Sequence, residues 1–289
     1  MLNGYKLVAV CLTKIQDEIT YELIDALYQT VKGSDYRLLL FNSFSDLYNQ
    51  DIYDEGAKSI YQLINYDLID AVVIKADTIN DQQVINDLIA KSKERQIPVI
   101  LLNMKAEGCY SIVPSYEDAF SQLIEHVIRV HHKRKLYFLS GSMGESNSMY
   151  REKIFRETLR ECGIDPQTAK VAYGEYWYGP AEQAVENWIQ SGDLPEAIIC
   201  ANDAMAVAAC KVLKRHGIRV PEDMIVTGFD GVSSYQFHRP ALSTCTRTPS
   251  VLAGKCREML TNILEKKKPP YRDLEEYILT IQESCGCQK

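Results

Sequence analysis

The sequence PEAIICANDAMAVAACKVLKRHGIRVPEDMIVTGFDGVSSYQFHRPALSTCTRTP, residues 195–249, decides the fold that we predict for this chain. It begins with the apolar run Ala197–Cys200, whose length and composition are typical of a strand buried on both faces of a parallel sheet. The segment Ala204–His216 has apolar residues at mostly helical spacing, and Gly217 after it suits a left-handed helix cap. A second strand, Ile225–Gly228, completes a βαβ unit.

Polar side chains follow both strands of this unit. Asn202 and Asp203 come directly after the first strand, and Asp230 follows the second strand and Phe229. Ligands of open α/β sheets bind at the carboxyl ends of the strands. We therefore expect Asp230 and Phe229, and Asn202 or Asp203, to contact a ligand, although a solvated turn at Asp230 and a helix cap at Asn202 are the simpler alternatives.

Strand and helix patterns alternate along the rest of the chain as well. This alternation predicts right-handed parallel α/β sheets. In the first half the expected strands are Tyr5–Leu12, Arg37–Phe41, Ile69–Ile74 and Val99–Asn103, and the expected helices are Ile19–Val31, Asp51–Asn65 and Asp81–Arg95. After a crossover near residues 110–116 the alternation resumes, which predicts a second lobe of the same kind.

Four linked motifs in residues 202–244 carry a family resemblance. They are Asn202-Asp203, Gly217-Ile218-Arg219-Val220-Pro221-Glu222-Asp223, Val226-Thr227-Gly228-Phe229-Asp230 and Pro240-Ala241-Leu242-Ser243-Thr244. In this order the chain resembles the effector-binding domain of the lactose/purine repressor (LacI/GalR) family, itself similar to periplasmic sugar-binding proteins. The match is looser in the first half, where Asp35 and Ala71 replace family glycines and Pro114-Ser115 stands where relatives usually have Asp-Asn.

The resemblance implies an α/β fold of the type I periplasmic binding protein kind, with two Rossmann-like lobes of parallel sheet joined by a three-segment hinge. The expected N-terminal lobe comprises residues 1–113 and 247–268. The expected C-terminal lobe comprises residues 114–246 and 269–285, followed by a tail at 286–289. In this family a ligand binds in the cleft between the lobes, and closure of the hinge carries the signal to an output domain.

The resemblance also suggests ligand-binding residues in the C-terminal lobe. Arg151 occupies the position of a family arginine, although Ile154-Phe155 replaces the Gly-Phe pair that usually follows; its fork of donors suits vicinal hydroxyls or a carboxylate. Tyr176 and Trp177 stand where relatives place an aromatic residue that stacks on a sugar ring. Surface exposure of the arginine and simple packing of the aromatic residues are the alternatives.

Further candidates lie in the hinge and in the N-terminal lobe. Arg247 falls in a hinge segment where relatives often have a polar residue facing the cleft. The strand-end rule adds three groups from the N-terminal lobe. These are Lys14 to Asp17, Lys75 to Asp77, and Asn103.

Composition and charge limit the class of protein. The 289 residues carry a formal net charge of −7 without a basic stripe, so direct DNA binding is not expected and DNA contact would need a separate domain absent here. No apolar run reaches the roughly 20 residues that span a bilayer, and the N-terminus reads as a strand rather than a signal peptide. Nine cysteines without a C-x-x-C pair suggest reduced thiols in the cytoplasm.

Motifs of catalysis and metal binding are missing from the sequence. There is no dinucleotide-binding G-x-G-x-x-G, no P-loop, no G-x-S-x-G and no H-E-x-x-H. The pair His131-His132 has no Cys or His partner at metal spacing, so we expect both rings to be exposed. The sequence thus predicts no enzyme, no cofactor and no metal site.

We therefore predict a ligand-sensing, allosteric domain of a LacI-type regulator. Its expected partners are a small polar effector (a sugar, sugar acid or nucleoside) and a second copy of the chain in a homodimer. A transport-type solute-binding protein is the alternative, and an α/β enzyme is a more distant one. The sequence leaves open the identity of the ligand, the nature of the output and the sign of the response.

Overall fold

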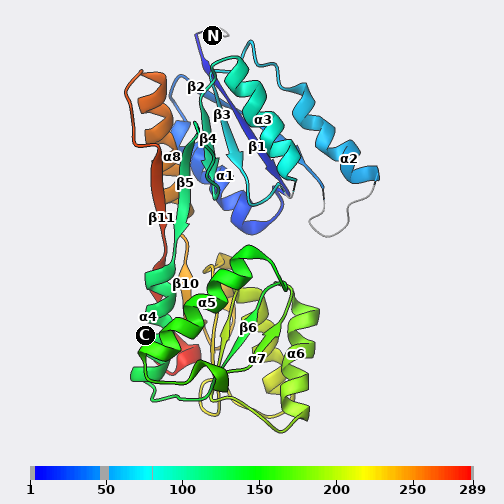
Figure 1. Cartoon of the computed structure of the whole chain (residues 1–289), viewed down its shortest axis with the longest axis vertical. Helices are drawn as coiled ribbons and strands as arrows, with labels where there is room; N and C mark the ends of the chain where they lie inside the picture. The colour runs from blue at the N-terminus through cyan, green and yellow to red at the C-terminus, as the bar shows by residue number, and fades with distance from the viewer. Residues whose placement is uncertain (1–3, 46–51, 80, 288–289) are drawn as a thin grey trace. The chain divides into compact units, whose positions relative to one another are not determined.

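The computed structural model describes residues 4–45, 52–79 and 81–287, and these residues form two α/β units (Figure 1). Unit 1 is Met1–Pro114 with Thr248–Glu275, and unit 2 is Ser115–Arg247 with Glu276–Lys289. The sequence placed residues 269–275 in the second lobe. They belong to unit 1 instead, because β11 (Arg272–Glu276) extends the sheet of that unit next to β5 (Tyr110–Ser115).

A six-stranded sheet forms the centre of unit 1, with the order β11-β5-β4-β3-β1-β2. The neighbours from β2 to β5 pair in parallel, as predicted. The strands not yet given bounds are β1 (Lys6–Thr13), β2 (Tyr36–Ser43), β3 (Ala71–Lys75) and β4 (Val99–Leu102). All of the side chains in β3 and β4 are buried, which is why these strands read as continuous apolar runs.

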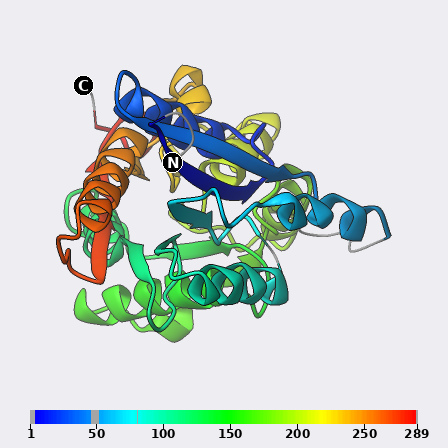
Figure 2. The same cartoon turned by 90° about the horizontal axis from the view of Figure 1, so that it is seen from above.

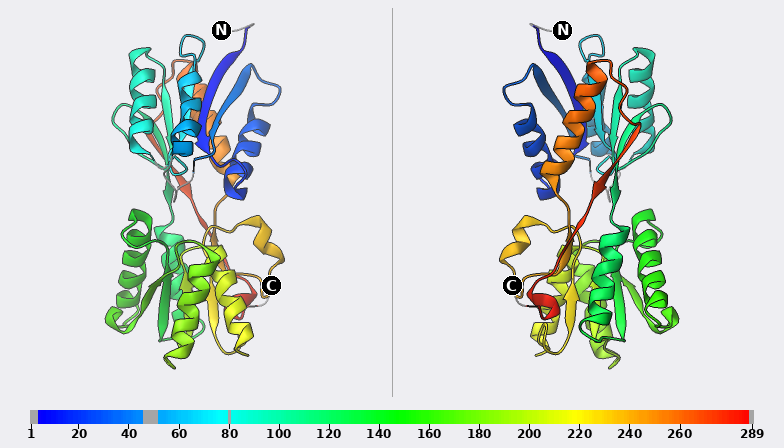
Figure 3. Two further views of the ribbon diagram at one scale, coloured as in Figure 1. Left: turned by 90° about the vertical axis from the view of Figure 1, so that its right-hand side faces the viewer. Right: turned by 90° about the vertical axis from the view of Figure 1, so that its left-hand side faces the viewer.

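Helices cover both faces of this sheet (Figures 2 and 3). In β1, Val8 and Val10 face one hydrophobic cluster and Ala9 faces the other, because successive side chains of a strand point to opposite faces. One face packs against α1 (Glu18–Val31) and α8 (Pro249–Leu264), and the other against α3 (Gln82–Glu94) and the 3₁₀ turn η1 (Ser59–Leu63).

One expected helix of unit 1 differs from the prediction. In place of a helix over 51–65, the structure has α2 (Ile52–Lys58), which continues as η1. Asp51 lies outside the described residues.

Unit 2 is built on a four-stranded parallel sheet with the order β7-β6-β8-β9. Its strands are β6 (Leu136–Ser140), β7 (Val171–Tyr173), β8 (Ala197–Cys200) and β9 (Ile225–Thr227). Its helices are α4 (Glu117–Arg129), α5 (Ser146–Glu161), α6 (Tyr178–Gln190) and α7 (Asp203–Arg215). Helices α4 and α5 pack together on one face of the sheet and α6 and α7 on the other (Figure 3).

A short antiparallel ribbon completes unit 2. It consists of β10 (Thr244–Thr246) and β12 (Ile278–Thr280) and leads to the 3₁₀ turn η4 (Glu283–Cys285).

The predicted α/β class with parallel sheets is thus confirmed. Among the described residues, no helix is long and apolar enough to cross a membrane, and all nine cysteines are free thiols.

Candidate functional site

The strand order of unit 2 reverses between β6 and β8, the point at which open α/β sheets bind ligands. The loop after β6 begins at Gly141, and the loop after β8 contains Ala201 and Asn202. Most of the residues predicted for the C-terminal lobe lie around these two loops and the turn that follows β9.

Arg151 is the central residue of this region. It lies on α5, its side chain is only 8% exposed, and its Nη1 donates a 2.5 Å hydrogen bond to the carbonyl of Ala201. Its buried Nε has no protein partner. Burial alone would lower the pKa of Arg151, but the charge of Asp230 and the neighbouring tyrosines raise it, so the guanidinium stays charged.

Aromatic rings surround this guanidinium. Its central carbon lies 3.9 Å from the centroid of the Phe229 ring and 5.3 Å from that of Tyr116. Tyr116, Phe229 and Tyr277 contact one another, with centroid separations of 5.2 to 5.5 Å. Tyr116 and Tyr277 were not predicted as site residues, since they belong to segments without a strand-end motif.

Asp230 lies in the turn after β9. Its φ of +96° is in the left-handed region, which non-glycine residues rarely adopt. The turn is held by backbone hydrogen bonds, from the Asp230 N–H to the Cys245 carbonyl at 2.9 Å and from the Arg247 N–H to the Asp230 carbonyl at 3.1 Å. Backbone conformations of this kind are concentrated at functional sites, and these hydrogen bonds hold the turn that carries the carboxylate.

The carboxylate of Asp203 holds this turn through hydrogen bonds. Its side chain is 2% exposed and accepts 2.8 Å hydrogen bonds from the Val232 N–H and the Thr244 hydroxyl. Desolvation and the neighbouring Asp230 raise the pKa of Asp203 to about 7. A Cβ on Gly228 would lie 2.1 Å from the Asp203 carboxylate, so only glycine fits there. Asp203, one of the two residues predicted as a ligand contact after β8, is thus hydrogen-bonded to the protein and buried.

Phe229 and Asn202, also predicted as ligand contacts, have protein partners of their own. Phe229 is completely buried beneath the Arg151 guanidinium, so its ring fixes the arginine. Asn202 caps α7 by accepting from the Met205 N–H at 2.9 Å, and its amide donates to the Tyr176 carbonyl at 3.1 Å. Both of its polar groups therefore have protein partners, as the alternative interpretation of a helix cap predicts.

Tyr176 lies against the first turn of α5. Its hydroxyl donates to Glu145 Oε2 at 3.0 Å and lies 2.8 Å from the Ser148 hydroxyl. Burial raises the pKa of this phenol. The ring covers Gly141, where an added Cβ would lie 2.0 Å from it. Glu145, which the sequence did not single out, caps α5. Burial alone would raise the pKa of Glu145, but the hydrogen bonds that its carboxylate accepts lower it.

The other predicted residues of unit 2 are more exposed. Trp177 is 63% exposed at the start of α6 and packs edge-on against Tyr178. Arg247 is half-buried, with its guanidinium carbon 5.7 Å from the Tyr277 ring centroid. Tyr277 thus lies in the same group of residues as Arg151 and Arg247.

Unit 1 brings its own predicted residues to one edge of its sheet. Lys75 is 2% exposed and donates to both carboxylate oxygens of Asp77 at 2.8 Å. Asn103 follows the neighbouring strand β4 with a φ of +67°, and its buried Oδ1 has no hydrogen-bond partner. Asp17 is the exposed N-cap residue of α1, after β1. All of these side chains follow the carboxyl ends of parallel strands.

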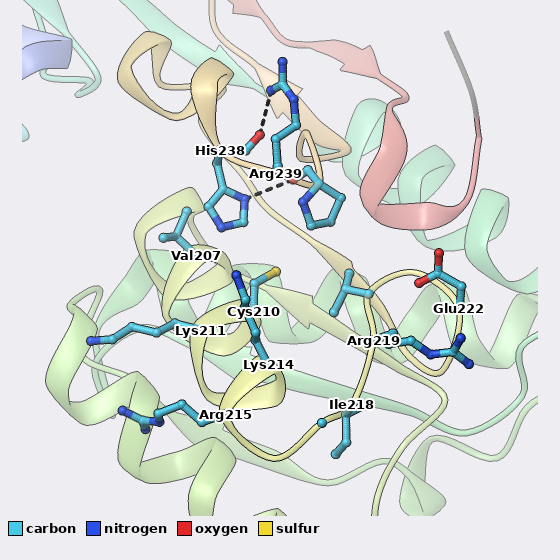
Figure 4. A pocket seen from close by; sticks show the side chains of 13 residues that line it. Val207, Cys210, Lys211, Lys214, Arg215, Ile218, Arg219, Glu222, His238 and Arg239 are labelled. Atoms are coloured by element: carbon cyan, nitrogen blue, oxygen red, sulfur yellow. Dashed lines mark hydrogen bonds between the residues drawn. The ribbon is translucent and has the colours of Figure 1, made fainter.

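Unit 2 also contains a separate hollow of about 870 Å³ beside α7, which none of the predicted site residues lines (Figure 4). Lys211 and Arg215 extend to the same side of it, where both contact Glu182, whereas Arg219 points the other way. All three form ion pairs with acidic residues, which are Glu182, Glu186 and Asp223. We therefore assign no ligand to this hollow.

The expectation for the histidine pair is half wrong. His132 is exposed, as predicted. His131 is half-buried because its ring packs edge-on against that of His126, with the centroids 4.9 Å apart.

Comparisons with known proteins agree with this architecture. The family model of the periplasmic binding protein-like domain matches residues 124–285. The chain is 25% identical over 275 residues to the HTH-type transcriptional repressor PurR of Photobacterium profundum, which covers 94% of this chain and 79% of that protein. It is 26% identical over 242 residues to the probable HTH-type transcriptional repressor ExuR of Bacillus subtilis. This match covers 80% of this chain and 71% of ExuR.

A solved structure supports the fold independently. The lac repressor dimer bound to operator and the anti-inducer ONPF matches with a TM-score of 0.79 and 18% identity, over 98% of this chain and 95% of that one. The relatives in these comparisons are transcriptional repressors and not enzymes. The chain therefore belongs to the family of periplasmic binding protein-like domains.

Proposed function

We propose that this domain senses a small polar metabolite, a sugar or sugar derivative, through Arg151 and Asp230 of unit 2. The observation that carries the proposal is the state of Arg151. Its guanidinium is charged, buried and held on Phe229, yet its Nε has no protein partner. A buried donor without a partner costs about 1–3 kcal/mol, so a ligand oxygen that accepts from it would be strongly favoured.

Other orphan polar groups lie at the same edge of the sheet. The buried hydroxyls of Ser140 and Thr227 have no protein partner, and these residues end β6 and β9. A site with hydroxyl, guanidinium and carboxylate groups against aromatic rings suits a molecule that has both hydroxyls and an apolar C–H face. Sugars, sugar acids and nucleosides share this chemistry.

The ligand is proposed to bind between the two lobes, so that Lys75, Asp77, Asn103 and Asp17 of unit 1 complete the site. The support for this is the family resemblance together with the unpartnered Oδ1 of Asn103. A ligand that contacts both lobes stabilises the closed arrangement by its difference in affinity for the closed and open forms. That closure is the proposed signal.

The proposal extends to the partners of the domain. The relatives carry the names of transcriptional repressors, and the matched lac repressor structure is a dimer bound to operator. We accordingly propose a homodimer in the cytoplasm that controls DNA binding through a separate domain.

Isothermal titration calorimetry against a panel of sugars, sugar acids and nucleosides tests the proposal. A ligand of the panel is expected to bind the parent chain, and Arg151→Ala or Asp230→Asn should weaken its binding at least about tenfold, or ~1.4 kcal/mol. Arg156→Ala on the same helix and Asp223→Asn in an exposed turn are matched controls that keep the affinity. Unchanged affinity in both site variants, with circular dichroism showing the native fold, would refute the assignment.

A further inference from the structure

Four side chains of unit 2, far from one another in the sequence, meet at one point. They are His126, His131, Cys285 and Cys287, which we call the Cys–His cluster. One donor atom from each residue lies within 4.8 Å of all the others. His126 lies in the last turn of α4, and His131 lies just beyond it. Cys285 ends η4, and Cys287 follows Gly286.

The separations between donor atoms are those of a tetrahedral metal site. The two Nε2 atoms lie 3.1 Å apart, and the Nε2 of His126 lies 3.6 Å from Sγ of Cys285 and 3.4 Å from Sγ of Cys287. The Nε2 of His131 lies 3.5 Å from Sγ of Cys287. Zn–N bonds of about 2.0–2.1 Å and Zn–S bonds of about 2.3 Å give tetrahedral edges of about 3.3 Å between nitrogens and about 3.5 Å between nitrogen and sulfur.

From this geometry we infer that the Cys–His cluster binds one Zn²⁺ ion with four protein ligands. Two thiolates and two neutral imidazoles would cancel the charge of the ion, and binding would release the two thiol protons. Two sulfur and two nitrogen donors in a tetrahedron select zinc over magnesium or calcium, which prefer oxygen ligands. Four protein ligands leave no open position, as in structural rather than catalytic zinc sites.

The fold holds the cysteine half of the cluster in place without the ion. On the C-terminal side, the Ser284 hydroxyl donates to the Val226 carbonyl at 2.6 Å and accepts from the Ser243 N–H at 2.9 Å. These bonds fix η4 to the sheet, and Gly286 then turns the chain with a φ of +96°. This turn brings the second cysteine back to the histidines.

The cluster is also open to the arrival of an ion. A hollow of about 800 Å³ is lined by His131, Cys285 and Cys287 among others. Cys285 itself is fully buried, whereas the other three ligands are partly exposed. The proposed ion would join the C-terminal segment to the end of α4, independently of the effector site around Arg151.

Metal uptake by the whole chain tests this inference. The protein is kept reduced, stripped of metal with a chelator and titrated with Zn²⁺ against a chromophoric competitor. We expect one Zn²⁺ per chain and a higher melting temperature on binding. His131→Ala and Cys287→Ser should each lower the affinity more than about tenfold, while His132→Ala and Cys162→Ser, outside the cluster, should keep it.

Cobalt substitution identifies the ligands directly. Co²⁺ in the parent chain should show a thiolate-to-metal charge-transfer band and the intense visible bands of a tetrahedral site. The charge-transfer band should weaken in Cys287→Ser and stay unchanged in Cys162→Ser. Because Cys287 is partly exposed near the end of the chain, the metal-free variant should keep the circular dichroism of the parent.

Three results would each overturn the inference. One is a parent chain that takes up no zinc, and another is a His131→Ala/Cys287→Ser double variant with the parent's affinity. The third is a disulfide between Cys285 and Cys287 that persists after treatment with a reductant, which a count of free thiols would detect. None of these results bears on the proposed effector site.

Discussion

The guanidinium carbon of Arg151 lies 3.9 Å from the centroid of the Phe229 ring. A cation over an aromatic face contributes about 2 kcal/mol or more when both groups are desolvated. Here the contact also fixes the direction of the guanidinium fork, because Phe229 is fully buried and cannot move aside. The phenylalanine of the V-T-G-F-D motif and the arginine of α5 thus act together, although 78 positions separate them in the sequence.

Replacement of Arg151 by lysine should separate the effect of charge from that of shape. Lysine keeps the positive charge but loses the planar fork that stacks on Phe229 and donates in two directions. We expect the affinity for the effector, measured by calorimetry, to fall by about tenfold or more, or ~1.4 kcal/mol. Arg156→Lys, on the same helix, should bind normally. Equal affinity in both variants would show that charge alone is sufficient.

Gly141→Ala should disturb the site through Tyr176. The added Cβ would lie 2.0 Å from the phenol ring, so the ring must shift and its hydrogen bond to Glu145 must break. We expect the free energy of unfolding in urea to fall by about 1–3 kcal/mol. Gly179→Ala is the matched control, since no atom lies within 4 Å of its added Cβ and the residue is helical. Equal stability of the two variants would contradict the packing described.

The buried carboxyl of Asp203 should make stability depend on pH. Its pKa of about 7 in the folded state lies above the value of about 3.9 in an unfolded chain. The folded state therefore binds more protons between these values, and the free energy of unfolding should fall as the pH rises from about 4 to about 7. The contribution of this group to the slope is at most about 1.4 kcal/mol per pH unit.

Urea denaturation at a series of pH values checks this prediction. Asp203→Asn should remove the contribution of this group to the slope, because asparagine does not titrate. Glu222→Gln, at an exposed position, should leave the slope as in the parent. A parent slope that survives in Asp203→Asn would assign the pH dependence to another group.

Gly286→Ala should weaken zinc binding although it replaces no ligand. Its φ of +96° is costly for alanine, while the nearest atom to the added Cβ is 3.6 Å away, so the effect is on the backbone. We expect a lower affinity for Zn²⁺ in the competition titration. Gly163→Ala, also at positive φ and with no atom within 4 Å, should cost about 1 kcal/mol of stability and keep the zinc affinity.

The sequence was sufficient for the strands and helices with strong patterns. Ala197–Cys200 was expected as a buried strand and forms β8 with the same bounds, because every one of its side chains is apolar and buried. The sequence was not sufficient to predict the pairing of β5 with β11, which lie side by side in the sheet of unit 1. These strands contain polar residues, and their pairing joins segments more than 150 residues apart, so local pattern carries no signal for it.

Site residues divide in a similar way. The strand-end rule brought Asp230, Asp203 and Asn202 to one edge of the sheet, and the structure places them there. The sequence did not predict how deeply each of these side chains is buried, because burial depends on what packs above a residue. Asp203 and Phe229 are buried, and they contact the turn after β9 and the Arg151 guanidinium. The ligand contacts themselves stay predictions.

By itself, the sequence determined the alternation of strands and helices, the family and the residues at the strand ends, because these depend on local apolar periodicity and on linked motifs. Only the tertiary structure decided which side chains are buried and which distant ones meet. Cys285 and His126 are separated by 159 positions, yet their donor atoms lie 3.6 Å apart. Spacing along the chain cannot reveal such a contact, because it exists only when η4 is fixed against the sheet and α4 ends beside it.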